Sequence, residues 1–101
     1  MTLTSKQRAY LKSLAADMEP VFQIGKSSVS PEITSAIAET FNTHERVKIT
    51  VLKNCVEDVK DVAITVSERT RSELVQVIGR KFVLYKPFKD DPKIILPKSK
   101  K

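Results

Sequence analysis

The chain is 101 residues long and carries a formal net charge of +6, with 18 Lys and Arg against 12 Asp and Glu. These values predict a single domain that favours a polyanionic partner, nucleic acid before an anionic membrane surface. No apolar run approaches the roughly 20 residues of a membrane span, and residues 1–6 lack a signal-peptide core. The single cysteine, Cys55, excludes an internal disulfide framework. We therefore expect a cytosolic protein without a membrane partner.

The first predicted elements are a helix and a short strand. Thr4 and Gln7 have the spacing of a capping box, in which each side chain binds a backbone amide of the other residue. The residues that follow repeat at the spacing of one apolar helical face, namely Leu11, Leu14, Ala15 and Met18. Pro20 blocks further helix, and residues 21–24 predict a strand.

A second helix and a second strand come next. Ser30 suits the N-cap, Pro31 the first helical position and Glu32 the positive end of the helix dipole. We expect this helix to end near residues 42–44. Beyond it, apolar and polar residues alternate, which predicts a strand with one solvated face that carries Lys48 and Thr50 and one buried face with Val47, Ile49 and Val51.

The last part of the domain predicts a helix and a hairpin. Asn54 lies three residues before Glu57, the spacing of a further N-cap, and Val59, Val62, Ala63 and Val66 then keep helical periodicity. Strands are predicted over residues 74–78 and 82–86, with a tight hairpin at residues 79–81.

The predicted order is therefore α-β-α-β-α-β-β, an α/β fold with a mixed four-stranded sheet packed by helices. The strand-helix-strand crossovers imply parallel pairing, and the final hairpin implies an antiparallel pair. We expect one domain over residues 1–97, with the apolar residues 94–96 pinning part of the C-terminal segment, and a basic flexible tail over residues 98–101.

Catalytic and metal-binding chemistry finds little support in this composition. His44 and Cys55 are eleven residues apart without an obvious orienting acid, and a zinc site would need more soft ligands than one His and one Cys. The carboxylates of Glu57, Asp58 and Asp61 favour a solvated helix face. We therefore expect no enzyme, no metal, no cofactor and no small-molecule substrate.

The strongest candidate site is the loop that precedes the second helix. Gly25 allows a sharp turn or a close backbone approach, Lys26 adds a positive charge, and Ser27 and Ser28 add hydroxyl donors. Backbone amides at the following helix N-terminus favour an anion, so the segment is suited to one or two phosphates. The alternative is an ordinary strand-to-helix turn with a solvated lysine.

A second basic turn lies in the predicted hairpin. Gly79 is followed by Arg80 and Lys81, and the returning strand ends in Tyr85 and Lys86. A tyrosine beside cations is able to stack on an unpaired base. The alternatives are a charged hairpin tip and a core ring with its hydroxyl at the surface, the second being favoured for Tyr85.

The order of these elements and two sequence segments resemble a known family, the CRM domain in its stand-alone bacterial form, the YhbY-like RNA-binding proteins. The segments are residues 3–11, LTSKQRAYL, and residues 77–86, VIGRKFVLYK. The resemblance extends over residues 2–97. It implies a fold like the C-terminal domain of the third bacterial translation initiation factor, RNA binding without catalysis, and association with precursors of the large ribosomal subunit.

The family's first loop has the pattern Gly-x-x-Gly, which is compared with the RNA-clamping loop of KH domains. Carried over, the pattern begins at Gly25, its middle residues are Lys26 and Ser27, and Ser28 replaces the second glycine, for which we expect retuned binding. RNA would be held there, on a basic surface extended by Arg80, Lys81 and Lys86, and by Lys6, Arg8 and Lys12 if the first helix faces the same way. The expected protein is a monomer that binds ribosomal RNA or a pre-ribosomal particle. The alternative is an adaptor that binds an acidic ribosomal or assembly protein through the same face.

Overall fold

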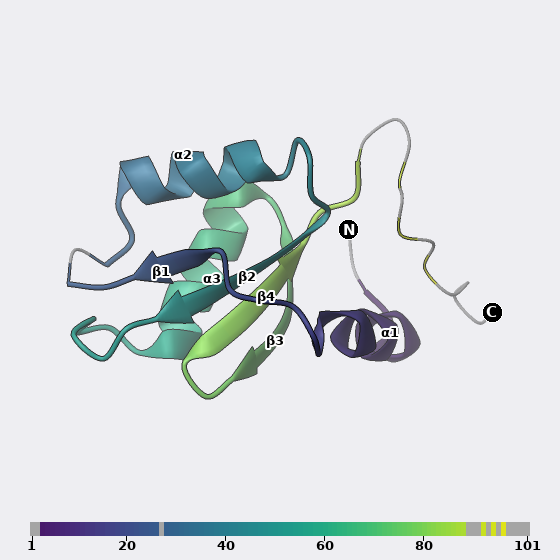
Figure 1. Ribbon diagram of the computed structural model, residues 1–101, viewed down its shortest axis with the longest axis horizontal. Helices are drawn as coiled ribbons and strands as arrows, with labels where there is room; N and C mark the ends of the chain where they lie inside the picture. Colours follow the sequence, from purple (N-terminus) through teal and green to yellow (C-terminus); the bar gives the residue numbers. More distant parts are fainter. Residues whose placement is uncertain (1–2, 27, 89–91, 93, 95, 97–101) are drawn as a thin grey trace.

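The computed structural model describes residues 3–26, 28–88, 92, 94 and 96. Seven elements follow the predicted order: α1 (Ser5–Ala15), β1 (Phe22–Ile24), α2 (Pro31–Thr40), β2 (Arg46–Val51), α3 (Val59–Thr70), β3 (Glu73–Ile78) and β4 (Lys81–Tyr85). No helix within these residues is long and apolar enough to cross a membrane. Figure 1 shows α2 and α3 against the sheet, with α1 beyond its other side.

The four strands form one mixed sheet in the order β1-β2-β4-β3, which confirms the predicted fold class. β1 pairs with β2 in parallel, as the crossover through α2 requires. β4 pairs antiparallel with β2 on one side and with β3 on the other. β3 therefore runs in the same direction as β2 without touching it, because the returning strand of the hairpin lies between them.

The larger core lies between the sheet and the helices α2 and α3. Strand residues at alternate positions face it, and they are joined by the apolar faces of both helices, with Ile24, Ile37, Val47, Ile49, Val51, Val66, Phe82 and Leu84 among its buried members. β2 alternates between buried and half-buried residues along its whole length, so the predicted two-faced strand is confirmed.

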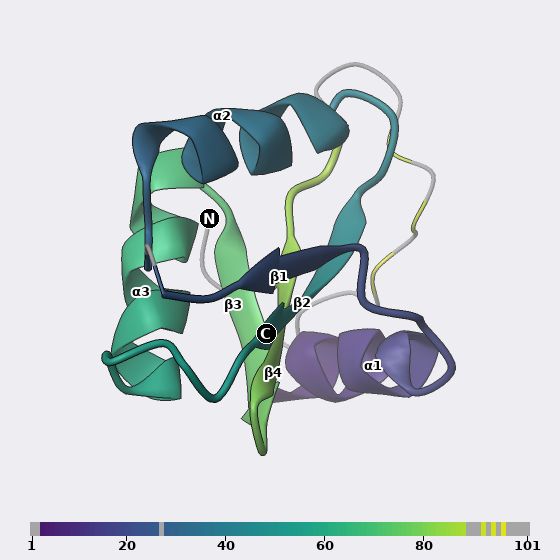
Figure 2. The same ribbon diagram turned by 60° about the vertical axis from the view of Figure 1, so that its left-hand side comes forward.

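A smaller core lies on the opposite face of the sheet, under α1. It contains Leu11 and Ala15 of the helix and Val75, Val83 and Tyr85 of the sheet. Figure 2 shows α1 on the opposite side of the sheet from α2. The end nearer the β3–β4 turn is not covered by α1, and Ile78 there is 62% exposed. The molecule thus has helices on both faces of the sheet, but one face is only partly covered.

Side-chain caps begin the three helices, two of them as predicted. The Thr4 and Gln7 side chains form a reciprocal capping box on α1, and the Ser30 hydroxyl accepts from the amide of Ile33 at the start of α2. The prediction of a cap at Asn54 is wrong. Asp58 caps α3 instead, where its carboxylate accepts from the amide of Lys60 at 3.2 Å. α2 ends at Thr40, slightly earlier than expected.

The C-terminal segment is tied back to the domain by one buried carboxylate. Glu45 is 4% exposed, and its two carboxylate oxygens accept from the amides of Phe88 at 2.8 Å and Ile94 at 2.7 Å. Ile94 and Leu96 pack against the smaller core. The expectation that apolar residues pin this segment is therefore confirmed for these two residues, whereas Ile95 and the tail 98–101 lie outside the described residues.

Candidate functional site

Both glycine turns predicted from the sequence lie at the same end of the sheet. β1 and β2 are parallel with Ile24 opposite Val51, so the loops that follow both strands leave from one edge. The amide of Val51 donates to the carbonyl of Arg80 at 2.6 Å, which places the β3–β4 turn at that edge as well. The N-termini of α2 and α3 follow directly from these loops, so this end gathers two turns and two helix starts.

Close packing, and not a left-handed backbone, favours glycine at position 25. A Cβ at this position would lie 3.0 Å from Oδ1 of Asn54 and 3.3 Å from Cδ1 of Leu52, since the loop after β2 presses against it. The residue with a left-handed backbone is Ser28, at φ 54°. The predicted role of Gly25 as a turning residue is thus corrected. The left-handed backbone of this turn is at Ser28, the position at which the Gly-x-x-Gly pattern has its second glycine.

Ser28 is held by two contacts besides its strained backbone. Its amide donates to the carbonyl of Gly25 at 2.8 Å, which closes the loop into a tight turn. Its hydroxyl donates to the carboxylate of Glu57 in the loop before α3. A carboxylate therefore already occupies one hydroxyl donor that the sequence assigned to a phosphate.

We expect Ser28→Gly to be more stable than Ser28→Ala by about 1 kcal/mol. Both variants lose the hydroxyl contact with Glu57, but only glycine adopts the left-handed region without a Cβ penalty. Urea unfolding of the two variants measures the difference directly. Equal stabilities would show that the left-handed backbone at this position costs nothing.

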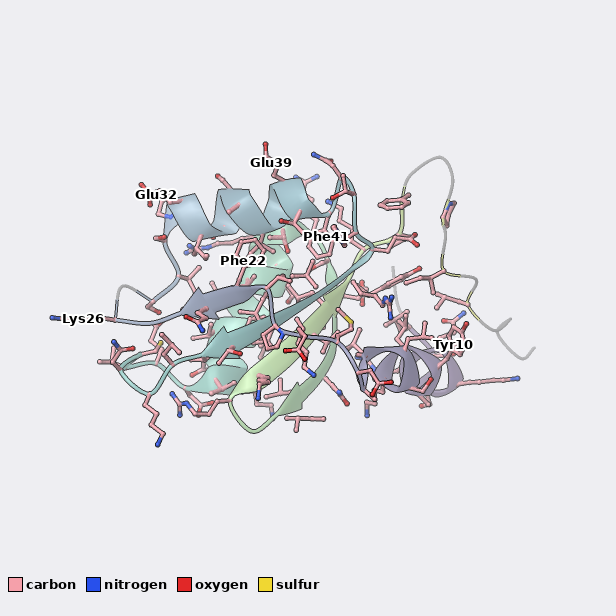
Figure 3. The ribbon with its side chains drawn as sticks, in the orientation of Figure 1. Tyr10, Phe22, Lys26, Glu32, Glu39 and Phe41 are labelled. Atoms are coloured by element: carbon pink, nitrogen blue, oxygen red, sulfur yellow. The ribbon has the colours of Figure 1, made fainter. Side chains whose placement is uncertain are left out.

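Lys26 is the most accessible cation of this loop. Its side chain is exposed, and Figure 3 shows it pointing away from the body of the protein. Ser27 lies outside the described residues. The adjoining helix start offers less than predicted, since Pro31 has no amide hydrogen, the amide of Ile33 is bound by Ser30, and Glu32 adds a carboxylate.

Arg80 in the second turn is bound to the loop after β2. Its Nε donates to the carbonyl of Val51 at 2.9 Å, and its Nη2 donates to the carbonyl of Leu52 at 2.6 Å. The residue remains exposed, so its charge still faces solvent. Arg80 therefore fixes the turn to the neighbouring loop in addition to contributing positive charge.

Tyr85 and Lys86 differ from the sequence-based expectation for a binding surface. Tyr85 is 1% exposed and belongs to the smaller core. The hypothesis that its ring stacks on an unpaired base is therefore wrong, and the favoured alternative, a ring in the core, is what the structure shows. Burial, and secondarily the Glu45 carboxylate, raises the pKa of the Tyr85 hydroxyl. Lys86 donates through Nζ to the carbonyl of Thr70 at 3.1 Å, at the C-terminal end of α3 and away from the two turns.

The three cations of α1 do not share one role. Lys6 is exposed on the helix surface. Arg8 donates through Nη1 to the carbonyls of Leu74 and Val75, the second at 3.2 Å, which anchors α1 to β3 where the strand is irregular. Lys12 points to the partly covered face of the sheet, on the opposite side from α2. Of these three cations, only Lys12 lies beside a predicted site residue of another element, Lys81 of β4, since both line one groove.

Lys12 and Lys81 line a groove of about 450 Å³ together with Lys48, which we call the lysine groove. Its remaining walls come from Ala16, Gln76, Ile78 and Val83. The three cations come from α1, β2 and β4, and none of these seven residues is acidic. Lys48 is positioned by a hydrogen bond from its Nζ to the carbonyl of Met18 at 3.2 Å.

The sequence-based site did not include Lys48, Gln76 or Lys53. Lys48 was recognised as lying on the solvated face of its strand, but only the sheet order places that face beside α1. Gln76 reaches the same face because a register shift between Leu74 and Gln76 resets the alternation of β3. Lys53 is exposed in the loop that packs against Gly25, and nothing in its local sequence distinguishes it from other surface lysines.

The structure does not bring His44 and Cys55 together. They lie beyond opposite ends of β2, which begins at Arg46 and ends at Val51. Cys55 is buried with its Sγ 3.9 Å from Oγ of Ser28, whereas His44 is exposed beside Thr43. Among the described ranges there is also no group of three His, Cys, Asp or Glu residues able to hold a metal ion.

Comparisons with known proteins give a consistent result. The model of the CRS1 / YhbY (CRM) domain matches residues 3–86. A Bacillus subtilis protein named as a probable RNA-binding protein, YqeI, is 44% identical over 95 residues, covering 94% of this chain and 99% of the relative. A Haemophilus influenzae protein named as an RNA-binding protein is 32% identical, covering 96% and 97%.

A solved structure supports the same grouping. The solution structure of a hypothetical protein from Staphylococcus aureus superimposes with a TM-score of 0.80 at 46% identity, covering 95% of this chain and all of the other. The similarity therefore extends over the sheet, the three helices and both basic turns, not over one motif alone.

Proposed function

The chain belongs to the CRS1 / YhbY (CRM) domain family, and from this premise we propose that it is a non-catalytic RNA-binding protein. The similarity to the relatives named as RNA-binding proteins extends over nearly the whole length of those proteins and nearly all of this chain. The RNA-binding property would therefore reside in the domain itself. The net charge of +6 is of the sign that a polyanion requires.

The observation that carries the proposal is the meeting of the two glycine turns at one end of the sheet. The exposed Lys26 and Arg80 are brought to that edge by the parallel β1–β2 pair and by the β3–β4 turn. Phosphate oxygens would be bound by their side chains, which fixes position without reading base sequence. Glu57, whose carboxylate accepts from the Ser28 hydroxyl, and Glu32 in the first turn of α2 place negative charge beside this loop, so the exposed cations are the groups available to phosphate.

The finer proposal concerns the target. We propose that the RNA is ribosomal, within a precursor of the large subunit, and that the protein acts as a monomer in the cytosol. The support is the resemblance of the loop 25–28 and of residues 77–86 to the YhbY-like proteins. Association with an acidic protein partner is the competing function, and it predicts a complex that survives ribonuclease.

We expect Lys26→Glu to weaken binding to a ribosomal RNA fragment by about tenfold, because one attractive charge is replaced by a repulsive one at the exposed tip of the loop. Filter binding at several salt concentrations measures this, with Arg69→Glu as the control. Arg69 is exposed in the last turn of α3, at the opposite end of that helix from the turns.

Two results would contradict the proposal. Equal losses for Lys26→Glu and Arg69→Glu would mean that net charge alone matters and that the loop is not the site. A cellular pull-down in which an acidic protein remains bound after ribonuclease treatment would favour the adaptor. Loss of the bound partners under the same treatment supports RNA binding.

A further inference from the structure

We infer that the lysine groove is a second phosphate-binding site, and that one RNA strand crosses the open sheet face between it and the loop 25–28. The inference rests on the proposed function, because it identifies where further backbone phosphates would be held. The sequence assigned Lys12 and Lys81 to a basic RNA-binding surface, but it did not predict the groove that they form with Lys48 on the face of the sheet opposite α2 and α3.

Part of this face of the sheet is not covered by α1. α1 covers Val75, Val83 and Tyr85, but beyond them Ile78 is left 62% exposed. The groove between α1 and the strands has a volume of about 450 Å³, within the range of sites that hold ligands in proteins. This face is thus hollowed beside the helix rather than flat.

The groove carries a concentrated positive charge. Lys12, Lys48 and Lys81 line it, and none of its other described lining residues carries a compensating carboxylate. Like charges held around one groove repel each other, and an anion between them removes that cost. Gln76 adds an amide able to donate or accept, and no aromatic ring is present for base stacking. Phosphate is therefore better matched to the groove than a base.

A row of side chains on the same face of the sheet extends from the groove toward the loop 25–28. The strand register aligns Gln23 with Thr50, Thr50 with Lys81, and Lys81 with Ile78, so one row of side chains crosses all four strands on this face. Gln23 lies two residues before Gly25. The row spans three strand spacings of about 4.8 Å each, several times the rise of about 3.4 Å per nucleotide in a stacked strand.

A long, flexible polyanion fits this geometry better than a compact one. A single phosphate would occupy the groove alone, whereas the row extends from the groove to Gln23, three residues before Lys26. The occupant we assign is therefore an RNA strand that is bound through its backbone. An acidic peptide is the competing occupant, and competition between RNA and such a peptide for the groove separates the two.

The test compares two double variants that lose the same charge. Lys12→Gln with Lys81→Gln removes two exposed cations from the groove, and Lys60→Gln with Arg69→Gln removes two exposed cations from α3, which packs on the other face of the sheet. Lys48 is left in place, because it also bonds the carbonyl of Met18. Thermal unfolding verifies that both variants are folded.

We expect the groove variant to bind a ribosomal RNA fragment about tenfold more weakly than the α3 variant. The slope of log affinity against log salt concentration should also become shallower by about 1.5 in the groove variant, as the loss of two phosphate contacts predicts. In NMR titrations of the wild type with the same RNA, the amide signals of Gln76 and Ile78 should shift together with that of Lys26.

The outcomes separate the two proposals. If the wild type binds no RNA, the proposed function fails. If the wild type binds RNA and Lys26→Glu weakens it, but the groove and α3 variants are equal, the groove is overturned and RNA binding stands. Inorganic phosphate that displaces RNA beyond its ionic-strength effect would overturn the strand in favour of a free-phosphate site. An acidic peptide that saturates the groove while RNA does not would overturn it likewise.

Discussion

Replacement of Glu45 by alanine is expected to lower the free energy of unfolding by about 3 kcal/mol. The buried carboxylate accepts two backbone hydrogen bonds, from Phe88 and Ile94, and hydrogen bonds to a charged group contribute roughly 1.5–3 kcal/mol each. Alanine removes both acceptors and leaves two amides of the C-terminal segment unpaired. Urea unfolding measures the loss.

The same variant should release the C-terminal segment locally. Hydrogen exchange at the amide of Ile94 should accelerate more than exchange in β2, because the contact with Glu45 is what holds that amide. Glu45→Gln, which keeps one carbonyl oxygen, should lose about half as much stability. Glu39→Ala is the matched control, since Glu39 is exposed on α2 and Figure 3 shows it pointing away from the sheet. A Glu45→Ala variant as stable as this control would disprove the anchoring role.

Replacement of Arg80 by lysine is expected to lower the free energy of unfolding by about 2 kcal/mol even though the charge is kept. The guanidinium donates to the carbonyls of Val51 and Leu52 from two nitrogens at once, a geometry that a single ammonium group does not reproduce. Arg80→Ala should lose a similar amount. Lys81→Ala, at the neighbouring exposed position, should change stability by less than about 0.5 kcal/mol.

RNA affinity separates the two roles of Arg80. Measured at a temperature where all variants are folded, Arg80→Lys should stay within about threefold of the wild type, since phosphate attraction depends mainly on charge. Arg80→Ala should bind about fivefold more weakly. Arg80→Lys with wild-type stability would show that the hydrogen bonds to the loop after β2 are not structural, and equal RNA binding by the lysine and alanine variants would remove Arg80 from the RNA surface.

The residues with the clearest functional signal in the sequence have unequal roles in the structure. Arg8, Arg80 and Lys86 donate to backbone carbonyls of other elements or loops, so each of them fixes packing as well as carrying charge. Their positive charges were apparent from sequence, but these hydrogen-bond partners are between 16 and 67 positions away along the chain. Local patterning carries no information about such contacts.

The order of elements, the capping box at Thr4, the cap at Ser30 and the two-faced strand β2 were determined by local sequence. Such features depend on residues within a few positions of one another, so spacing alone reveals them. The predicted cap of α3 at Asn54 is wrong, because the Asn54 side chain lies against Gly25 and Asp58 caps the helix instead.

The meeting of charges from separate elements depends on the tertiary structure. The sequence placed Lys12 and Lys81 on separate elements and Lys48 on a solvated strand face, and the strand order β1-β2-β4-β3 with α1 across one end of the sheet makes them one groove. Tyr85 is buried in the folded protein, and in the first loop the left-handed backbone is found at Ser28 and not at Gly25. Periodicity determines which face of an element is polar, whereas long-range packing determines what that face meets.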